Sequence, residues 1–92
     1  MKFCAMKGCR RPVREQRYVW ALLLAWDSLS LDRRDEIRLA ITSAAASPEE
    51  ERALFDVLIR QRQAEAVARR CGVGVRRLYE LKCRAYEQIS VR

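Results

Sequence analysis

The chain has 92 residues, a formal net charge of +7 and no histidine, and half of its residues are hydrophobic. This length and composition predict one small domain with a modest hydrophobic core and exclude a disordered chain. No apolar run approaches the roughly 18 to 20 residues that span a bilayer, and the basic N-terminus is not followed by an apolar signal core. We therefore expect a cytoplasmic protein without membrane contact, whose four cysteines are reduced.

The charge is unevenly distributed along the chain. Residues 1–17 carry +5, residues 18–59 carry −4, and residues 60–92 carry +6. A basic beginning and a basic end with an acidic middle favour a partner rich in phosphate, such as a nucleic acid.

Residues 1–11 form a basic arm that contains Cys4 and Cys9 in the stretch CAMKGCRRPV. This stretch resembles the first half of a small zinc knuckle found in phage-related proteins, but the second half is missing. A tetrahedral zinc site needs four ligands, so Cys71 and Cys83 would complete it only if the arm folded back or a second chain contributed. We expect free thiols and no cofactor, with zinc as the alternative.

The first helix is predicted from Pro12 to about Ser28, with proline in its first turn. Its expected core face consists of Tyr18, Val19, Leu22, Ala25, Trp26 and Leu29. Val13, Trp20 and Leu24 lie on roughly the opposite side of this helix. They predict either a homodimer interface or a helix that the domain covers on both faces.

Two further helices are predicted in the middle of the chain. Ser30 or Asp32 can begin one that runs to about Ala45, whose narrow apolar face consists of Ile37, Ala40, Ile41 and Ala44. Ser47, Pro48 and Glu50 form a strong start, a capping box, for the next one. That helix is expected to run to about Arg60 and to bury Ala53, Leu54, Val57 and Leu58.

The last part of the chain predicts a helix, a tight turn and a second helix. The first of these helices has Ala64, Val67, Ala68 and Cys71 on one face. Gly72 suits the left-handed conformation of the turn, and Gly74 can cap the last helix. The inward face of that helix is predicted to consist of Val75, Leu78, Leu81, Ala85 and Ile89.

These elements predict an all-α fold of about five helices. Residues 1–11 are the arm, and residues 12–92 are a single helical domain. Within this domain, residues 12–46 are expected to form a two-helix hairpin, and residues 47–92 a trihelical helix-turn-helix unit of the kind that binds DNA.

Ser47 to Ile89 resembles domain 4 of bacterial sigma factors and related small phage and prophage regulators. The stretches that carry the resemblance are SPEEERALFDVLI, QAEAVARR, the turn CGVG, and RRLYELKCRAYEQI. The family usually has Ser or Thr where Gly74 stands, and its basic DNA-reading positions fall on Val75 and Tyr79. The resemblance implies a bacterial host cell or its nucleoid as the location.

The outward face of the last helix provides the candidate DNA-reading residues. Helical spacing from Leu78, together with the resemblance, predicts base contacts by Val75, Arg76, Tyr79, Glu80 and Cys83. Arg76 can bind guanine and Glu80 can accept from cytosine, while Tyr79 can pack on a thymine methyl. Phosphate contacts are predicted for Arg62, Arg69, Arg70, Arg77, Lys82 and Arg84.

The expected function is sequence-specific binding of double-stranded DNA, as a transcription activator or antiterminator of the phage type. One alternative is a sigma-like module that binds RNA polymerase with little DNA specificity. Another is a recognition subunit for phage DNA packaging. Without histidine, a nucleophile motif or a glycine-rich phosphate loop, we do not expect an enzyme.

Overall fold

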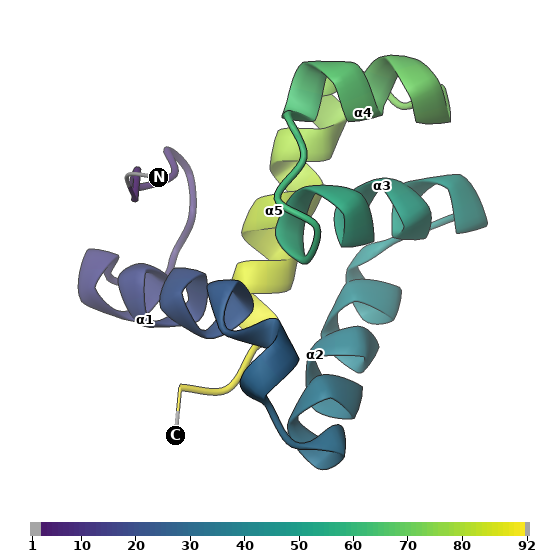
Figure 1. The fold of residues 1–92 in the computed structure, drawn as a ribbon. Coiled ribbons are helices and arrows are strands. Elements are labelled where there is room, and N and C mark those ends of the chain that lie inside the picture. The colour runs from purple at the N-terminus through teal and green to yellow at the C-terminus, as the bar shows by residue number, and fades with distance from the viewer. Residues whose placement is uncertain (1–2, 92) are drawn as a thin grey trace.

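The computed structural model describes residues 3–91 and contains five α-helices (Figure 1). The helices and one short 3-10 turn are α1 (Val13–Leu24), η1 (Trp26–Ser28), α2 (Leu31–Ala44), α3 (Pro48–Leu58), α4 (Ala64–Cys71) and α5 (Val75–Gln88). No strand occurs between residues 3 and 91, so the predicted all-α class is confirmed. In the same range, no helix has the length and apolar character needed to cross a membrane.

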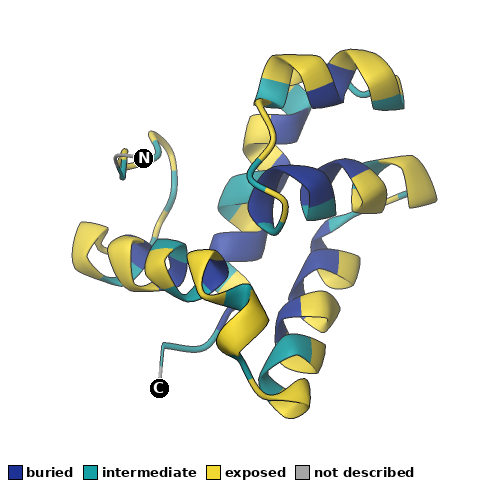
Figure 2. Ribbon diagram, in the orientation of Figure 1, coloured by how far each residue is buried: buried dark blue, intermediate teal, exposed yellow. Residues whose placement is uncertain are grey.

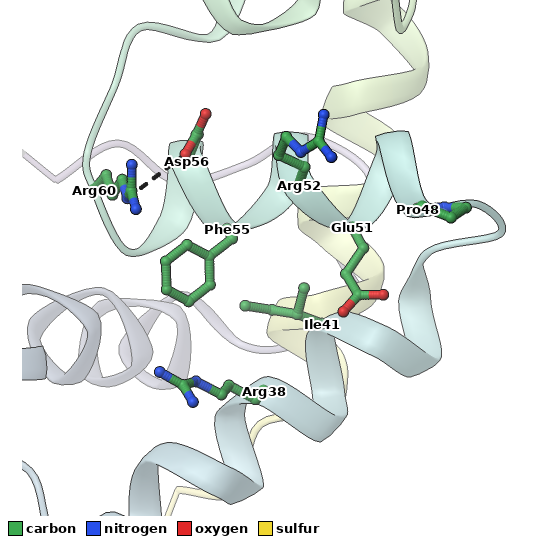
Figure 3. Close-up of a pocket in the computed structure, with 8 residues that line it drawn as sticks. All are labelled: Arg38, Ile41, Pro48, Glu51, Arg52, Phe55, Asp56 and Arg60. Atoms are coloured by element: carbon green, nitrogen blue, oxygen red, sulfur yellow. Dashed lines mark ion pairs between the residues drawn. The ribbon is translucent and has the colours of Figure 1, made fainter. Parts of the chain in front are cut away.

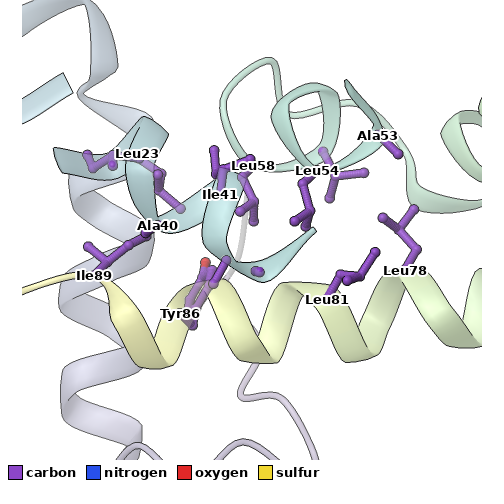
Figure 4. Packing of buried hydrophobic residues seen from close by; sticks show 14 of the residues in the cluster. Leu23, Ala40, Ile41, Ala53, Leu54, Leu58, Leu78, Leu81, Tyr86 and Ile89 are labelled. Atoms are coloured by element: carbon purple, nitrogen blue, oxygen red, sulfur yellow. The ribbon is translucent and has the colours of Figure 1, made fainter. Parts of the chain in front are cut away.

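Helix α5 runs through the middle of the molecule and packs against α2, α3 and α4 (Figure 1). Leu78, Leu81 and Ala85 are fully buried, and Ile89 just after the helix is 2% exposed. Their spacing of three or four residues places them on one face of the helix. In Figure 4 the side chains of Leu78 and Leu81 point toward Ala53 and Leu54 of α3. Most of the predicted inward face of α5 is therefore confirmed.

Val75 is the exception on that face. It is the first residue of α5 and remains 38% exposed. At this end of the helix no other element covers the side chain, so its prediction as a core residue was wrong.

The predicted core faces of α2 and α3 are both confirmed. All eight residues named from the sequence are buried: Ile37, Ala40, Ile41, Ala44, Ala53, Leu54, Val57 and Leu58. The helix starts also follow the prediction, because the hydroxyl oxygens of Ser30 and Ser47 accept hydrogen bonds from the backbone N–H groups of Arg33 and Glu50, each at 3.2 Å. The local sequence was sufficient to predict α2 and α3, because the capping residues and the spacing of the apolar residues indicate the same helices.

Helix α1 differs from the prediction in length and in its buried face. It ends at Leu24, where the Ala25 N–H bonds to the carbonyls of Ala21 and Leu22 and the chain turns into η1. The residues that α1 buries are Gln16, Val19 and Leu23, whereas Tyr18 is 41% exposed. Residues beyond Leu24 do not continue the helix, so the predicted face of Tyr18, Val19, Leu22, Ala25, Trp26 and Leu29 is only partly correct.

Gln16 explains why apolar spacing misplaced that face. Its side-chain carbonyl accepts from the Met6 N–H at 2.9 Å, and its amide donates to the Arg11 carbonyl at 2.8 Å. A polar side chain can be buried when both of its groups are bonded, which a count of apolar residues does not detect. Gln16 thereby joins the arm to α1.

The first two helices do not form a closely packed hairpin. Helix α2 packs mainly against α3 and α5, while α1 crosses the end of α5 and contributes Val19 and Leu23 to the core (Figure 1). Helix α2, from the predicted first part (residues 12–46), therefore packs directly against α5, from the predicted second part (residues 47–92).

The candidate interface residues of α1 have unequal surroundings. Val13 is 51% exposed and Leu24 is 45% exposed. Trp20 is half-buried, and its ring meets Phe3 of the arm edge to face, with centroids 5.7 Å apart. The chain's own arm therefore covers part of the predicted dimer surface.

The turn between α4 and α5 depends on Gly72, whose φ of +70° lies in the left-handed region. In this conformation the Val73 N–H reaches the Ala68 carbonyl at 3.0 Å and closes the end of α4. Ala68 and Leu78, on either side of the turn, are 2% and 0% exposed. The predicted glycine turn is confirmed.

Replacing Leu78 with alanine should lower the free energy of unfolding by about 3 kcal/mol, because a fully buried leucine leaves a cavity. The matched control is Leu39→Ala on α2, where the leucine is 67% exposed and the loss should stay within about 0.5 kcal/mol. Urea denaturation followed by circular dichroism measures both. Equal losses for the two variants would contradict the central position of Leu78.

Candidate functional site

The first half of α5 presents an exposed, chemically mixed surface. Val75 and Tyr79 are 38% and 44% exposed, and Arg76 and Glu80 are exposed beside them. At about 100° per residue, Arg76, Tyr79 and Glu80 lie roughly 100–200° from Leu78 around the helix, and Val75 lies about 60° from it, at the edge of this face. The predicted base-reading residues, apart from Cys83, therefore share one open face of the helix.

Arg77 points elsewhere and joins α5 to the start of α3. Its guanidinium donates to the two carboxylate oxygens of Glu50 at 2.9 and 3.3 Å, and the same carboxylate accepts from the Ala46 N–H at 2.8 Å. The hydrogen bonds from Arg77 and Ala46 lower the pKa of Glu50, and the bond to Glu50 raises the pKa of Arg77. Arg77 has a structural partner that the phosphate prediction did not include.

Arg70 is also engaged within the chain. It donates to the carboxylate of Asp56 at 2.6 Å, while Arg60 lies 3.8 Å from the other carboxylate oxygen. Asp56 is only 7% exposed, although its position in an otherwise apolar face gave no sign of a structural role. The sequence signal that was available is the four-residue spacing of Asp56, near the end of α3, and Arg60, two residues after the helix ends.

The remaining predicted phosphate contacts fall into two groups. Arg62, Arg69 and Arg84 are exposed, and within residues 3–91 none of them takes part in an ion pair. Lys82 is half-buried, and its ammonium lies 5.7 Å from the centre of the Tyr79 ring. Burial lowers the pKa of Lys82, because it disfavours the charged form.

The basic arm lies against the second half of α5. The Arg10 N–H donates to the Glu87 carboxylate at 2.8 Å, and the Arg11 guanidinium donates to the carbonyls of Tyr86 and Ile89. Tyr86 is 5% exposed, and its burial raises its pKa to about 12. The sequence did not indicate this contact, because it joins segments more than 70 residues apart.

The arm reaches Cys83 on the outward side of α5. The Cys83 sulfur lies 3.8 Å from the Lys7 carbonyl, and the thiol is half-buried. Burial, followed by the nearby Cys9, raises the pKa of Cys83. Cys83 is consequently less open than the sequence predicted, and the face available to a large partner is the first half of α5.

The arm folds back onto the second half of α5, which was the condition for a shared zinc site. Among residues 3–91, no group of three or more cysteine or carboxylate ligands is arranged to hold a metal ion. Cys83 meets the Lys7 carbonyl of the arm, while Cys71 is the last residue of α4 and precedes the turn. The arrangement of these thiols does not match a tetrahedral zinc site.

A separate groove lies between α2 and α3 (Figure 3). Ile41, Pro48 and Phe55 provide its apolar part, and Arg38, Arg52 and Arg60 stand around it. The guanidinium of Arg38 lies 5.9 Å from the centre of the Phe55 ring, and that of Arg60 lies 5.8 Å from it. Glu51 and Asp56 also line the groove, and Asp56 forms an ion pair with Arg60 at 3.8 Å (Figure 3). Arginine–aromatic stacking of this kind leaves donor groups of the Arg38 guanidinium available to an anionic partner.

No family model matches this chain, and no curated protein or solved structure matches it either. The resemblance to sigma factor domain 4 stays a prediction from the sequence.

Glu50→Gln should lower the thermal midpoint at pH 7, because it removes the carboxylate that binds Arg77 and the Ala46 N–H. A lowered pKa in the folded protein means that this stabilisation is complete above the unfolded value of about 4.3 and is lost as the pH falls through the folded value. The difference in thermal midpoint between the wild type and Glu50→Gln should consequently shrink as the pH falls below about 4.3, in a series of thermal melts at different pH.

Glu49→Gln is the matched control, since Glu49 is exposed and lies in the same first turn of α3. It removes the same charge from the same helix start without touching Arg77. A pH-independent difference for Glu50→Gln, or an equal effect of both variants, would contradict the role of the ion pair.

Proposed function

We propose that this protein binds double-stranded DNA in a sequence-specific manner and regulates transcription, with α5 entering the major groove. The observation that carries the proposal is the open face of Val75, Arg76, Tyr79 and Glu80 on the helix that follows a tight glycine turn. A helix that follows a tight turn and packs against the preceding helix is the arrangement that presents side chains to base edges.

The chemistry of this face suits a mixed base sequence. The Arg76 guanidinium can donate two hydrogen bonds to guanine, and the Glu80 carboxylate can accept from the amino group of cytosine. Val75 and Tyr79 offer apolar surface to a thymine methyl. Among residues 3–91, Arg76 forms no ion pair that would compete with a base.

Phosphate contacts on either side of this face would fix the position of α5 along the DNA duplex. Arg69 on α4, Arg62 before it and Arg84 on α5 are exposed and suited to this role. Arg70 and Arg77 are better assigned to the fold, because each binds a carboxylate of α3. Lys7 and Arg10 of the arm lie beside Arg76 and Arg84 in one groove and extend the positive surface.

The test is selection from a randomised DNA duplex pool, followed by affinity measurements on the enriched site over a salt series. Arg76→Ala should weaken binding by about 1–3 kcal/mol and relax the preference at one base pair. Arg69→Ala should weaken all sequences alike and reduce the salt slope by about one. Palindromic half-sites in the enriched sequences would further indicate a homodimer.

Arg52→Ala is the matched control for loss of one charge, because Arg52 is exposed in the α2–α3 groove. Its effect on the affinity for the selected site should be much smaller than that of Arg76→Ala. The docking of α5 would be wrong if Arg76→Ala and Glu80→Ala left the affinity and the selected sequence unchanged.

The α2–α3 groove favours a second candidate function, binding of a protein such as RNA polymerase. Arg38 and Arg52 beside an apolar floor suit an acidic segment of a partner protein, while Arg60 pairs with Asp56 at the edge of the groove. Co-purification with polymerase in the absence of DNA, abolished by Arg38→Glu and unaffected by Arg76→Ala, would support this function. Absence of association at every salt concentration would exclude it.

A further inference from the structure

A cavity of about 390 Å³ lies between the arm and α5. Its walls also include residues of α1, the end of α3, the link between α3 and α4, and the first residue of α4. Small-molecule sites in proteins usually enclose about 300–1,000 Å³ and combine apolar walls with a few convergent polar groups. The cavity has this size, and its lining contains both kinds of residue.

The apolar lining of the cavity comes from segments that the fold holds in place. Met6 of the arm and Trp20 of α1 line it together with Val57 and Leu58 of α3. The Met6 N–H donates to the side-chain carbonyl of Gln16 at 2.9 Å, which fixes the arm at this point. Aromatic, thioether and aliphatic side chains of this kind suit a planar ring.

Two polar groups of α5 line the cavity without a hydrogen-bond partner in the chain. Lys82 is half-buried; its ammonium lies 5.7 Å from the centre of the Tyr79 ring and forms no ion pair or hydrogen bond within residues 3–91. Tyr86 is only 5% exposed, and its hydroxyl has no partner in the same range. Their four-residue spacing makes the two side chains neighbours on the helix. An anion that accepts hydrogen bonds from both groups would offset the cost of burying them.

The charge of the lining distinguishes this cavity from the α2–α3 groove and from the groove beside Arg76. Carboxylates line both of those grooves: Glu51 and Asp56 in the first, Glu80 and Glu87 in the second. The described residues that line the cavity include Arg62 and Lys82 and no carboxylate. Glu65 accepts from the Tyr79 hydroxyl at 3.5 Å, but it is exposed and lies outside the lining. The cavity therefore favours an anionic ligand.

The link between α3 and α4 has an unusual backbone conformation where it borders the cavity. Gln61 has a φ of +57°, in the left-handed region that residues with a side chain adopt at a cost. Its side-chain amide donates to the Leu58 carbonyl at 2.7 Å, and the Arg62 N–H donates to the Asp56 carbonyl at 3.0 Å. Such strained residues are concentrated at ligand sites, where the surrounding structure holds them. These bonds keep Arg62 at the edge of the cavity.

We propose that this cavity is a binding site for a small aromatic carboxylate. The carboxylate accepts from the Lys82 ammonium, the Tyr86 hydroxyl and the Arg62 guanidinium, and the ring lies against the apolar lining that includes Trp20. This inference goes beyond the proposed function and does not depend on it. Tyr79 lines the cavity and also belongs to the open face of α5, so a bound ligand reaches the edge of the proposed DNA-reading surface.

The test titrates the isotope-labelled full chain with phenylacetate, in the absence of DNA, and follows the indole N–H signals by NMR. The Trp20 signal should shift and saturate with a dissociation constant of about 1 mM or lower. The Trp26 signal is the internal control and should not shift, because Trp26 packs against Phe55 and does not line the cavity. Phenylacetamide and phenethylamine, the neutral and cationic analogues, should bind at least about tenfold more weakly.

Lys82→Met removes the positive charge and keeps an apolar side chain of similar length. This variant should bind phenylacetate at least about tenfold more weakly, and circular dichroism checks that it is folded. Arg84→Met is the matched control, because Arg84 is exposed on the same helix and does not line the cavity. Its dissociation constant should differ from that of the wild type by less than about twofold.

Three results with the wild type alone would overturn the proposal. The first is equal affinity for phenylacetate and phenylacetamide, since the cations would then play no part. The second is the absence of a saturable shift at Trp20 up to the solubility limit of phenylacetate. The third is an equal Trp20 shift with acetate at the same concentration, since the ring would then contribute nothing. Failure of the proposed DNA binding would change none of these measurements.

Discussion

Burial of one face of α5 is the constraint on which the other elements depend. Leu78, Leu81 and Ala85 have no exposed surface, and α2, α3 and α4 all pack against this helix. Apolar burial contributes most of the stability of so small a core, and each of these side chains is surrounded by several elements. The outward face of α5 is consequently held at a fixed angle by residues that no partner can contact.

The arginines of the basic end serve two physical roles. Arg70 and Arg77 bind carboxylates on α3, so they hold α4 and α5 to that helix. Arg76 lies beside Arg77 in the sequence, but it is exposed on another face of the helix and forms no such bond within residues 3–91. Two adjacent residues of equal charge thus differ in role because a helix turns by about 100° per residue.

The arm connects the fold to the proposed DNA-binding surface. Its backbone and side chains bond to Gln16 of α1 and to the end of α5, and Phe3 covers part of Trp20. These contacts limit the open part of α5 to its first half, where Arg76 and Glu80 stand. The arm also brings the Lys7 carbonyl to 3.8 Å from the Cys83 sulfur, so it covers part of the outward side of α5.

Local sequence determined the class of the fold, the starts of α2 and α3 and the glycine turn, because caps, apolar spacing and a left-handed glycine are properties of short segments. It also placed Arg76, Tyr79 and Glu80 on the outward face of α5. Tertiary structure decided the buried face of α1, the partners of Arg70 and Arg77, and the path of the arm. Each of these depends on a bond between distant segments, such as Glu50 with Arg77 or Arg10 with Glu87, which no local pattern specifies.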